Sequence, residues 1–187
     1  MTRIIAGALG GRRIATPSSA HIRPTTDRVR EALFSSLESM VELAGARFAD
    51  VYAGSGAVGL EALSRGAAHV VFVEADPRTS RVIRENVAAL GVGAAARVVT
   101  GKVPAVLAGG PEGGPYDVVF ADPPYAVADS ELTALQLALR DEGWLAPDAV
   151  LVIERATRKG PVPWVAGIVA GRSRRYGETT LWYGFRS

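Results

Sequence analysis

The sequence predicts an α/β fold in which helices cover both faces of a mostly parallel sheet. Short apolar segments alternate along the chain with segments whose apolar residues recur at helical spacing. The short segments are almost continuously apolar, as is typical of strands that are buried on both faces. At 187 residues, 48% of them hydrophobic, the chain is long enough to bury a core. We therefore expect a single domain that spans residues 1–187.

The first 25 residues are expected to form a basic arm. Two short segments, 3–5 and 12–15, flank Gly7, Gly10 and Gly11. This pattern favours either a small hairpin or an irregular extension.

The first helix is predicted to begin at Thr26 or Asp27, because either side chain can act as its N-cap. From there the apolar residues recur every three or four positions as far as Val41. This spacing predicts an amphipathic helix.

Five strands and three helices are expected to follow in alternation. Each of these helices ends at a glycine, and the second begins at Asp76 and Pro77, where the missing proline N–H costs nothing. We interpret the glycine-rich segment 109–115 as a solvent loop, since the alternation continues after it. The strands are predicted at 47–53, 68–73, 97–100, 116–121 and 149–154, and the helices at 58–65, 77–90 and 130–142.

The tail is predicted to close the sheet with a hairpin. Residues 162–170 and 179–185 show the alternation of strands, with turn residues between them. This hairpin would add an antiparallel edge and bring the sheet to seven strands.

Charge is segregated along the chain, although the net charge is only +2. Residues 1–30 carry +5, residues 155–187 carry +6, and the middle carries −9. If the two ends converge in space, they present one cationic surface to a polyanion such as a nucleic acid. Nineteen of the 21 basic residues are Arg, which favours bidentate phosphate contacts and base stacking, although a coding bias toward Arg explains the preference equally well.

The composition excludes several classes of site. The chain has no Cys and only two His, His21 and His69, which lie far apart in sequence. Neither a disulfide framework nor a Cys/His zinc site can therefore form, and we predict no metal. No charged and then apolar leader and no apolar stretch of bilayer length is found, so we expect a cytoplasmic protein that binds no membrane.

The segment 50–59, Asp-Val-Tyr-Ala-Gly-Ser-Gly-Ala-Val-Gly, is predicted to form a strand end, a tight turn and a helix start. Gly54 and Gly56 permit a close backbone approach that a Cβ would block, and Gly59 lets the helix pack closely on the strand. Glu74 stands 20 residues after Gly54, where a carboxylate can accept hydrogen bonds from ribose hydroxyls. The pair predicts a cofactor that contains a nucleoside and leaves NAD and S-adenosylmethionine both open; for the glycines alone, a turn without a ligand is the alternative.

The tetrapeptide Asp122, Pro123, Pro124 and Tyr125, written D-P-P-Y below, favours S-adenosylmethionine. It follows the apolar strand 116–121, at the end where parallel sheets bind ligands. The Asp122 carboxylate and the Pro123 carbonyl can accept the two hydrogens of an NH₂ group, while the Tyr125 ring stacks on the attached base. The motif predicts methylation of a planar exocyclic amine, with a rigid turn after a buried strand as the simpler alternative.

These motifs resemble those of the RsmD family of bacterial 16S rRNA (guanine-N2) methyltransferases, which belong to the class I, Rossmann-like methyltransferases. The most specific part is the run Arg-Pro-Thr-Thr-Asp-Arg-Val-Arg-Glu-Ala-Leu-Phe at 23–34. The resemblance also rests on 3–7, 50–59, 122–125 and 175–181, and so covers nearly the whole chain.

The resemblance implies a seven-stranded methyltransferase sheet, S-adenosylmethionine as the cofactor, and a substrate within the assembled small ribosomal subunit or its precursor. We expect the enzyme to be a monomer. The implied catalytic residues are Asp122, Pro123 and Tyr125. Where many relatives carry an acid that contacts the adenine, this chain has Lys102, so contacts there would come from backbone groups. The implied cofactor-binding residues are Thr26, Asp50, Tyr52, Ala53, Gly54, Ser55, Gly56, Gly59, Glu74, Ala75, Lys102 and Val103.

Basic residues near both ends are predicted to contact RNA phosphates. For Arg28 the alternative is an ion pair with Glu31 at helical spacing. For Arg174 and Arg175 the alternative is a sheet edge protected by charge. The predicted RNA-binding residues are Arg12, Arg13, Arg23, Thr25, Arg28, Arg30, Arg174 and Arg175.

Other functions stay open at this point. An N-methyltransferase that acts on DNA adenine or on another RNA would use the same motifs. A ribosome-assembly factor without catalysis would not need Asp122, Pro123 and Tyr125, and a nicotinamide-dependent dehydrogenase would leave D-P-P-Y without a role. The resemblance implies methylation of the exocyclic N2 amine of a guanine in 16S rRNA, and this is the function that we expect.

Overall fold

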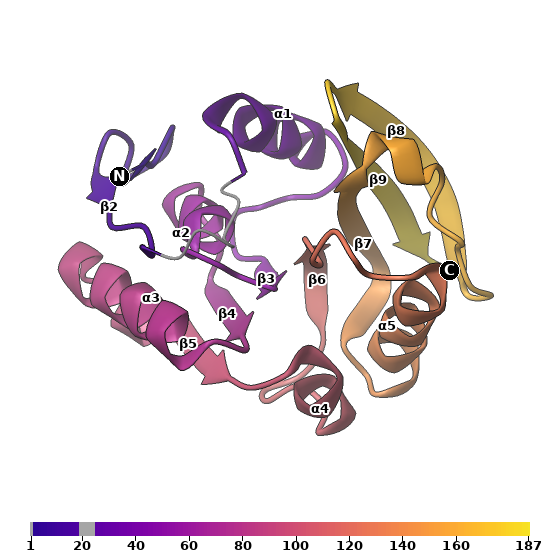
Figure 1. Cartoon of the computed structure of the whole chain (residues 1–187). Helices are drawn as coiled ribbons and strands as arrows, with labels where there is room; N and C mark the ends of the chain where they lie inside the picture. Colours follow the sequence, from indigo (N-terminus) through magenta and orange to yellow (C-terminus); the bar gives the residue numbers. More distant parts are fainter. Residues whose placement is uncertain (1, 19–24) are drawn as a thin grey trace.

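A seven-stranded sheet forms the centre of the computed structural model, which describes residues 2–18 and 25–187 (Figure 1). The strands are β3 Arg47–Val51, β4 His69–Glu74, β5 Ala96–Thr100, β6 Tyr116–Ala121, β7 Leu145–Ala156, β8 Ile168–Tyr176 and β9 Thr179–Arg186. Their order across the sheet is β5-β4-β3-β6-β7-β9-β8. Strands β3 to β7 are parallel to one another, β9 is antiparallel to β7, and β8 is antiparallel to β9. The predicted fold class is confirmed.

In the described part of the chain, five α-helices cover the sheet on its two faces (Figure 1). They are α1 Asp27–Glu38, α2 Ala57–Ser64, α3 Pro77–Leu90, α4 Val103–Ala108 and α5 Asp129–Asp141. Alternate strand residues point to opposite faces, so that in β3 Phe48 packs with α1, α2 and α3, whereas Ala49 packs with α4 and α5. No helix in the described part of the chain is long and apolar enough to span a membrane.

The helix boundaries follow from the capping residues that the sequence indicates. The Thr26 hydroxyl accepts a hydrogen bond from the Val29 N–H at 3.3 Å and begins α1. Asp76 caps α3, with Pro77 at the first helical position, and Gly91 ends it at a φ of 69°. These predicted boundaries are confirmed.

The N-terminal arm forms a small antiparallel hairpin of β1, Thr2–Arg3, and β2, Arg13–Ile14. It is fastened to α2 by the buried side chain of Glu61, whose carboxylate accepts hydrogen bonds from the N–H groups of Ile5 and Ala6 at 2.8 and 3.1 Å.

The strand order reverses between β3 and β6, which lie side by side in the centre of the sheet. In a parallel sheet this reversal opens a crevice beyond the carboxyl ends of the two strands. The glycine turn follows β3 and the D-P-P-Y motif follows β6, so the fold brings the two motifs to the same crevice.

Three elements differ from the prediction. Helix α4 was missed, because its six residues are too few for helical periodicity to be recognised. Strand β7 begins at Leu145, four residues before the predicted start, because a register irregularity and a positive φ at Asp148 interrupt its apolar pattern. The predicted strand at 162–170 was wrong: β8 is an edge strand rich in exposed Arg, a composition that protects sheet edges but hides the alternation.

Candidate active site

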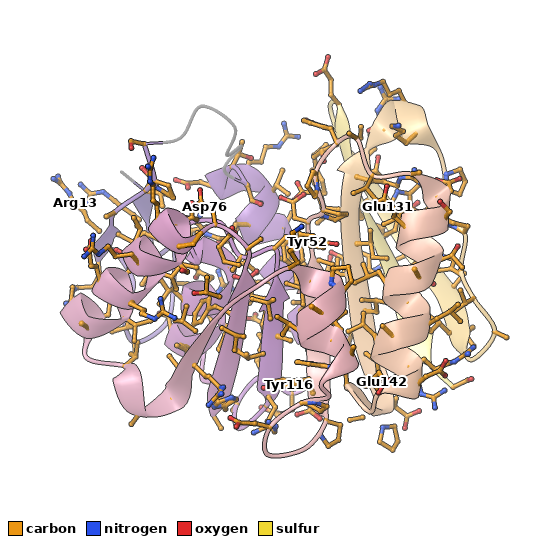
Figure 2. All side chains as sticks on the ribbon, turned by 60° about the horizontal axis from the view of Figure 1, so that its bottom comes forward. Arg13, Tyr52, Asp76, Tyr116, Glu131 and Glu142 are labelled. Atoms are coloured by element: carbon orange, nitrogen blue, oxygen red, sulfur yellow. The ribbon has the colours of Figure 1, made fainter. Side chains whose placement is uncertain are left out.

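Two adjoining hollows open where the parallel strands end. The first hollow has a volume of about 360 Å³ and the second about 340 Å³. They share the lining residues Tyr52, Gly54 and Asp122. Figure 2 shows Tyr52 at this end of the strands and Tyr116, the first residue of β6, at the opposite end. Both predicted motifs therefore contribute to one continuous surface.

Most of the predicted cofactor residues line one or both hollows, whereas Gly56 and Gly59 line neither. The first hollow is lined by Glu74 and Ala75 together with the D-P-P-Y residues. The second hollow is lined by Thr25, Thr26, Asp50, Ala53 and Ser55.

The turn after β3 places the backbone in unusual conformations. Tyr52 has a φ of 61° although it is not a glycine, a conformation that costs of order 1–3 kcal/mol. Gly54 has a φ of 57°, which a glycine adopts without strain. A Cβ on Gly59 would lie 2.3 Å from a ring carbon of Phe72, so only glycine allows α2 to pack this closely on β4.

Glu74 is held at the edge of the first hollow by two backbone groups. Its Oε1 accepts a hydrogen bond from the Gly54 N–H, and its Oε2 accepts one from the Asp76 N–H, both at 2.9 Å. Each carboxylate oxygen keeps a further lone pair that can accept a hydroxyl hydrogen. The carboxylate is therefore oriented before any ligand binds.

Asp50 is buried beneath the second hollow, with an exposed fraction of 1%. Its Oδ2 accepts a hydrogen bond from the Gly59 N–H at 2.9 Å. Burial raises the pKa of Asp50 to about 8; the hydrogen bond from Gly59 opposes the shift and the charge of Glu74 adds to it. At neutral pH this carboxyl is therefore mostly protonated, and a cation placed in the second hollow would favour its ionised form.

The D-P-P-Y turn forms the wall of the first hollow on the β6 side. Asp122 is half-buried, Pro123 is buried, and Tyr125 is 44% exposed. The turn is closed by a hydrogen bond from the Val127 N–H to the Pro124 carbonyl at 3.0 Å. The arrangement presents an acidic group, a rigid backbone and an accessible aromatic ring to the same space.

The opposite side of the first hollow comes from residues that sequence reasoning missed. Arg155 is the second-last residue of β7, Lys159 belongs to the short 3-10 helix η2, Thr157–Lys159, and Thr179 begins β9. Thr179 lies within the C-terminal segment that carried the family resemblance, and this was the available signal for it. Arg155 and Lys159 carry no local motif, because only the fold brings them to the hollow.

The predicted RNA-binding residues that the structure describes are mostly exposed. Arg12 and Arg13 lie on the N-terminal hairpin, and Arg28 lies in the first turn of α1. Arg174 and Arg175 lie at the end of β8, beside its turn into β9.

Thr25 and Arg23 complete the predicted RNA-binding residues. The Thr25 hydroxyl donates a hydrogen bond to Glu154 of β7 at 3.3 Å, which ties this residue to the sheet. Arg23 and His21 lie outside the described residues.

Arg30 departs from the prediction, because it is buried with an exposed fraction of 1%. It forms ion pairs with Asp27 at 3.1 Å and Glu61 at 3.4 Å, and it donates a hydrogen bond to the Arg3 carbonyl. Its charge serves the attachment of the arm, so we withdraw it from the RNA-binding set. Glu31, the alternative partner considered for Arg28, pairs instead with Arg65, at 3.2 Å.

Lys102 and Val103 lie at the start of α4 and line neither hollow. Lys102 is exposed and Val103 is buried. Within residues 2–18 and 25–187, no group of three or more His, Cys, Asp or Glu side chains could hold a metal ion.

Comparison with known proteins identifies relatives along almost the whole chain. The family model described as conserved hypothetical protein 95 matches residues 2–184. Ribosomal RNA small subunit methyltransferase D of Escherichia coli (strain K12) is 42% identical over 180 residues, which cover 91% of this chain and 87% of the relative. The protein of the same name from Haemophilus influenzae is 37% identical over 153 residues, which cover 81% of this chain and 77% of the relative.

Solved structures give the same result. The structure of yhhF, a candidate methyltransferase from Escherichia coli, superimposes with a TM-score of 0.87 at 36% identity and covers 99% of this chain and 97% of that one. A hypothetical protein from Thermus thermophilus superimposes with a TM-score of 0.77 at 35% identity and covers 98% of each chain. With its strand order, its glycine turn and its D-P-P-Y motif on one crevice, the chain belongs to the RsmD family of methyltransferases.

Proposed function

We propose that this protein transfers the methyl group of S-adenosylmethionine to the exocyclic N2 amine of a guanine in 16S rRNA. The observation that carries the proposal is the position of Asp122, which lines both hollows and so faces the glycine turn and the Tyr125 side together. The names of the relatives, which are methyltransferases of small-subunit ribosomal RNA, support the same class of substrate.

The residues of the glycine turn fit S-adenosylmethionine. Glu74, already oriented by the N–H groups of Gly54 and Asp76, would accept hydrogen bonds from the ribose hydroxyls. Asp50 lines the second hollow, where its ionised carboxylate would balance the charge of the α-ammonium group. When bound, the cofactor supplies an electrophilic methyl group.

Asp122 and the Pro123 carbonyl would hold the amine. Its two hydrogens are donated to these oxygens, which leaves the nitrogen directed at the methyl group. Asp122 would also stabilise the positive charge that develops on the nitrogen while the N–C bond forms and the bond between the methyl carbon and the sulfonium sulfur breaks, which leaves S-adenosylhomocysteine. The proton would pass from the methylated nitrogen to water after the transfer, so a strong base is not required.

Positioning provides most of the rate enhancement in this proposal. Reactants held in a productive orientation gain roughly 7–11 kcal/mol from proximity. Bringing the guanine into the first hollow costs a few kcal/mol of unstacking. Stacking on the Tyr125 ring would offset about 1–3 kcal/mol of this unstacking cost.

Affinity for the RNA would come from charges outside the hollows. Arg12, Arg13, Arg28, Arg174 and Arg175 are exposed and can contact phosphates that lie far from the reacting base. We propose that the enzyme acts in the cytoplasm as a monomer, on the assembled small subunit or its precursor.

Mass mapping of 16S rRNA tests the proposal. RNA from cells that lack the protein should lose one methyl group from one guanine, and the purified enzyme with S-adenosylmethionine should restore it to the N2 amine. A methyl group on a ring nitrogen, on an adenine or on another RNA would contradict the assignment. Intact methylation in cells that lack the protein would contradict it as well.

A further inference from the structure

The short segment from Thr157 to Pro161 is anchored at both ends beside the first hollow. At its start, the Thr157 N–H donates to the Glu178 carbonyl at 2.8 Å, and the Thr157 hydroxyl lies 2.8 Å from that of Thr180. At its end, the Pro161 carbonyl accepts a hydrogen bond from Arg155 at 3.0 Å. Residues between two such anchors are held in place relative to the hollow.

The segment presents two neighbouring cations with different surroundings. Arg158 and Lys159 are both exposed on η2. Lys159 lines the first hollow, whereas Arg158 does not. The chain therefore contains a matched pair, one cation at the rim of the hollow and one beside it.

Lys159 is the cation available to a ligand in the first hollow. Arg155 also lines it, but its guanidinium is held by Asp129 at 2.8 Å and by the Pro161 carbonyl. Within residues 2–18 and 25–187, Lys159 forms no ion pair or side-chain hydrogen bond. The Lys159 ammonium group is therefore neither buried in the core nor paired with an acid of the described residues.

The proposed reaction determines which part of the substrate reaches Lys159. The amine must lie at Asp122 and Pro123, and the base must lie against Tyr125, so the sugar and phosphate remain toward the open rim. A lysine ammonium is a compact, strongly hydrated charge that suits a phosphate oxygen. The acids of the hollow, Asp122 and Glu74, would repel that phosphate and so favour its placement on the Lys159 side.

We propose that Lys159 binds a backbone phosphate of the nucleotide that is methylated and so positions its base in the first hollow. The inference rests on the proposed function and adds a substrate-binding residue to it. A contact of this kind holds the flipped nucleotide at its phosphate while Asp122 and Tyr125 hold it at its base.

The test uses small subunits from cells that lack the protein, with Lys159→Gln and Arg158→Gln as the matched variants. Lys159→Gln should raise the KM for subunits roughly tenfold or more, because one charge-assisted contact is lost. Its kcat should stay near the wild-type value. The dependence of binding on salt should also weaken, by a slope of about 0.7 for one phosphate on single-stranded RNA. Lys159→Arg should restore most of the affinity.

Several results would overturn the inference. If Lys159→Gln and Arg158→Gln raised the KM and weakened the salt dependence equally, Lys159 would contribute only as general surface charge. A weaker affinity of Lys159→Gln for S-adenosylmethionine, measured by calorimetry, would assign the side chain to the cofactor. An unchanged KM and salt slope would mean that no phosphate is bound there.

The wild-type enzyme separates these results from failure of the proposed function. If the wild-type product is not N2-methylguanine, the proposed function fails whatever the variants do. If the wild-type product is N2-methylguanine and Lys159→Gln behaves like the wild type, only the role of Lys159 fails.

Discussion

The two walls of the crevice differ in how the chain builds them. The cofactor wall, which consists of the turn after β3 and the end of β4, comes from residues 50–59 and from Glu74. The substrate wall comes from segments that lie far apart in sequence: Asp122 to Tyr125 with Val127 and Leu132, then Arg155, Ala156 and Lys159, and finally Thr179. The cofactor wall combines a continuous motif with an acid at a recognisable distance from it, so a sequence pattern can reveal it, whereas a wall assembled from segments without such a pattern becomes visible only in the fold.

The walls also differ in what holds them. Backbone N–H groups orient the acids of the cofactor wall, with Gly59 bonded to Asp50 and Gly54 bonded to Glu74, both at 2.9 Å. The substrate wall is joined largely by side chains, such as Arg155 with Asp129 at 2.8 Å. We therefore expect changes in the cofactor wall to alter cofactor affinity, and changes in the substrate wall to alter rate and RNA binding.

The largest effect is expected at Asp122, where the two walls meet. Asp122→Ala should slow methyl transfer at least about 100-fold, because the group that stabilises the developing charge is lost. Affinity for the rRNA should change little, since most of it comes from distant Arg contacts. Single-turnover methylation of undermodified small subunits measures the rate, with Asp122→Asn as the control that keeps the size of the side chain. A near-normal rate for Asp122→Ala would contradict the role given to this carboxylate.

The next effect is expected on the cofactor wall. Glu74→Ala should weaken S-adenosylmethionine binding about 10- to 100-fold, because hydrogen bonds to a charged group contribute roughly 1.5–3 kcal/mol. Glu85→Ala, which removes an exposed acid from α3, serves as the control. Calorimetric titration with S-adenosylmethionine and with NAD compares the two cofactors. Unchanged affinity together with full activity would show that the ribose lies elsewhere.

A smaller effect is expected from the packing beneath the cofactor wall. Gly59→Ala should lower the free energy of unfolding by about 1–3 kcal/mol, since the added Cβ overlaps the Phe72 ring. Gly93→Ala is the matched control, because a Cβ there meets no atom within 4 Å. Urea unfolding measures both variants. Equal stability of the two would mean that α2 can move away from β4 without cost.

The smallest effect is expected from the ionisation of Asp50. If the cofactor requires the carboxylate, its affinity should fall by up to about tenfold between pH 8 and pH 7, and binding at pH 7 should take place with release of a proton. Titrations in buffers of different ionisation enthalpy measure this release, and Asp50→Asn should abolish it. Affinity that is independent of pH in this window would contradict the linkage.

The same carboxyl also predicts a dependence of stability on pH. Its pKa is raised from 3.8 to about 8 in the folded protein, so the folded state binds more protons between these values. This contribution to stability is therefore fully present below pH 3.8 and is lost as the pH rises through 8. Comparing Asp50→Asn with the wild type by urea unfolding across this window isolates the effect.

The fold and the cofactor wall were largely predictable from the sequence. Strand and helix alternation gave the parallel sheet, and capping residues such as Asp76 and Gly91 gave helix boundaries almost to the residue. Glu74 was found because its distance from Gly54 reflects one strand, helix and strand unit. Each of these signals comes from residues close together in sequence, so each can be recognised without the tertiary structure.

The substrate wall and the arm attachment were not predictable in the same way. Arg30 carries the charge of an RNA-binding residue, but it shares a helix face with the buried residues Leu33, Phe34 and Leu37, and this spacing was the available signal for its burial. Lys159 stands in a segment without a motif, and its importance depends on where η2 meets the first hollow. The ion pair of Arg30 with Glu61 spans 31 positions of sequence, and the D-P-P-Y residues of the hollow that Lys159 lines stand at least 34 positions before it, so a local pattern records neither relation.

The attachment of the N-terminal arm through Glu61 constrains how the protein can be shortened or varied. The buried carboxylate is satisfied by the backbone N–H groups of Ile5 and Ala6 and by the guanidinium of Arg65 at 2.9 Å. Because Ile5 and Ala6 contribute backbone groups, other residues can replace them. Glu61 contributes its side chain, so it cannot be replaced without losing these hydrogen bonds. Removing the arm would take two hydrogen-bond donors from the Glu61 carboxylate and uncover it, with Arg30 and Arg65 left as its partners. We therefore expect removal of the arm to lower the free energy of unfolding, and a mobile tag to be better tolerated at Ser187 than within the hairpin.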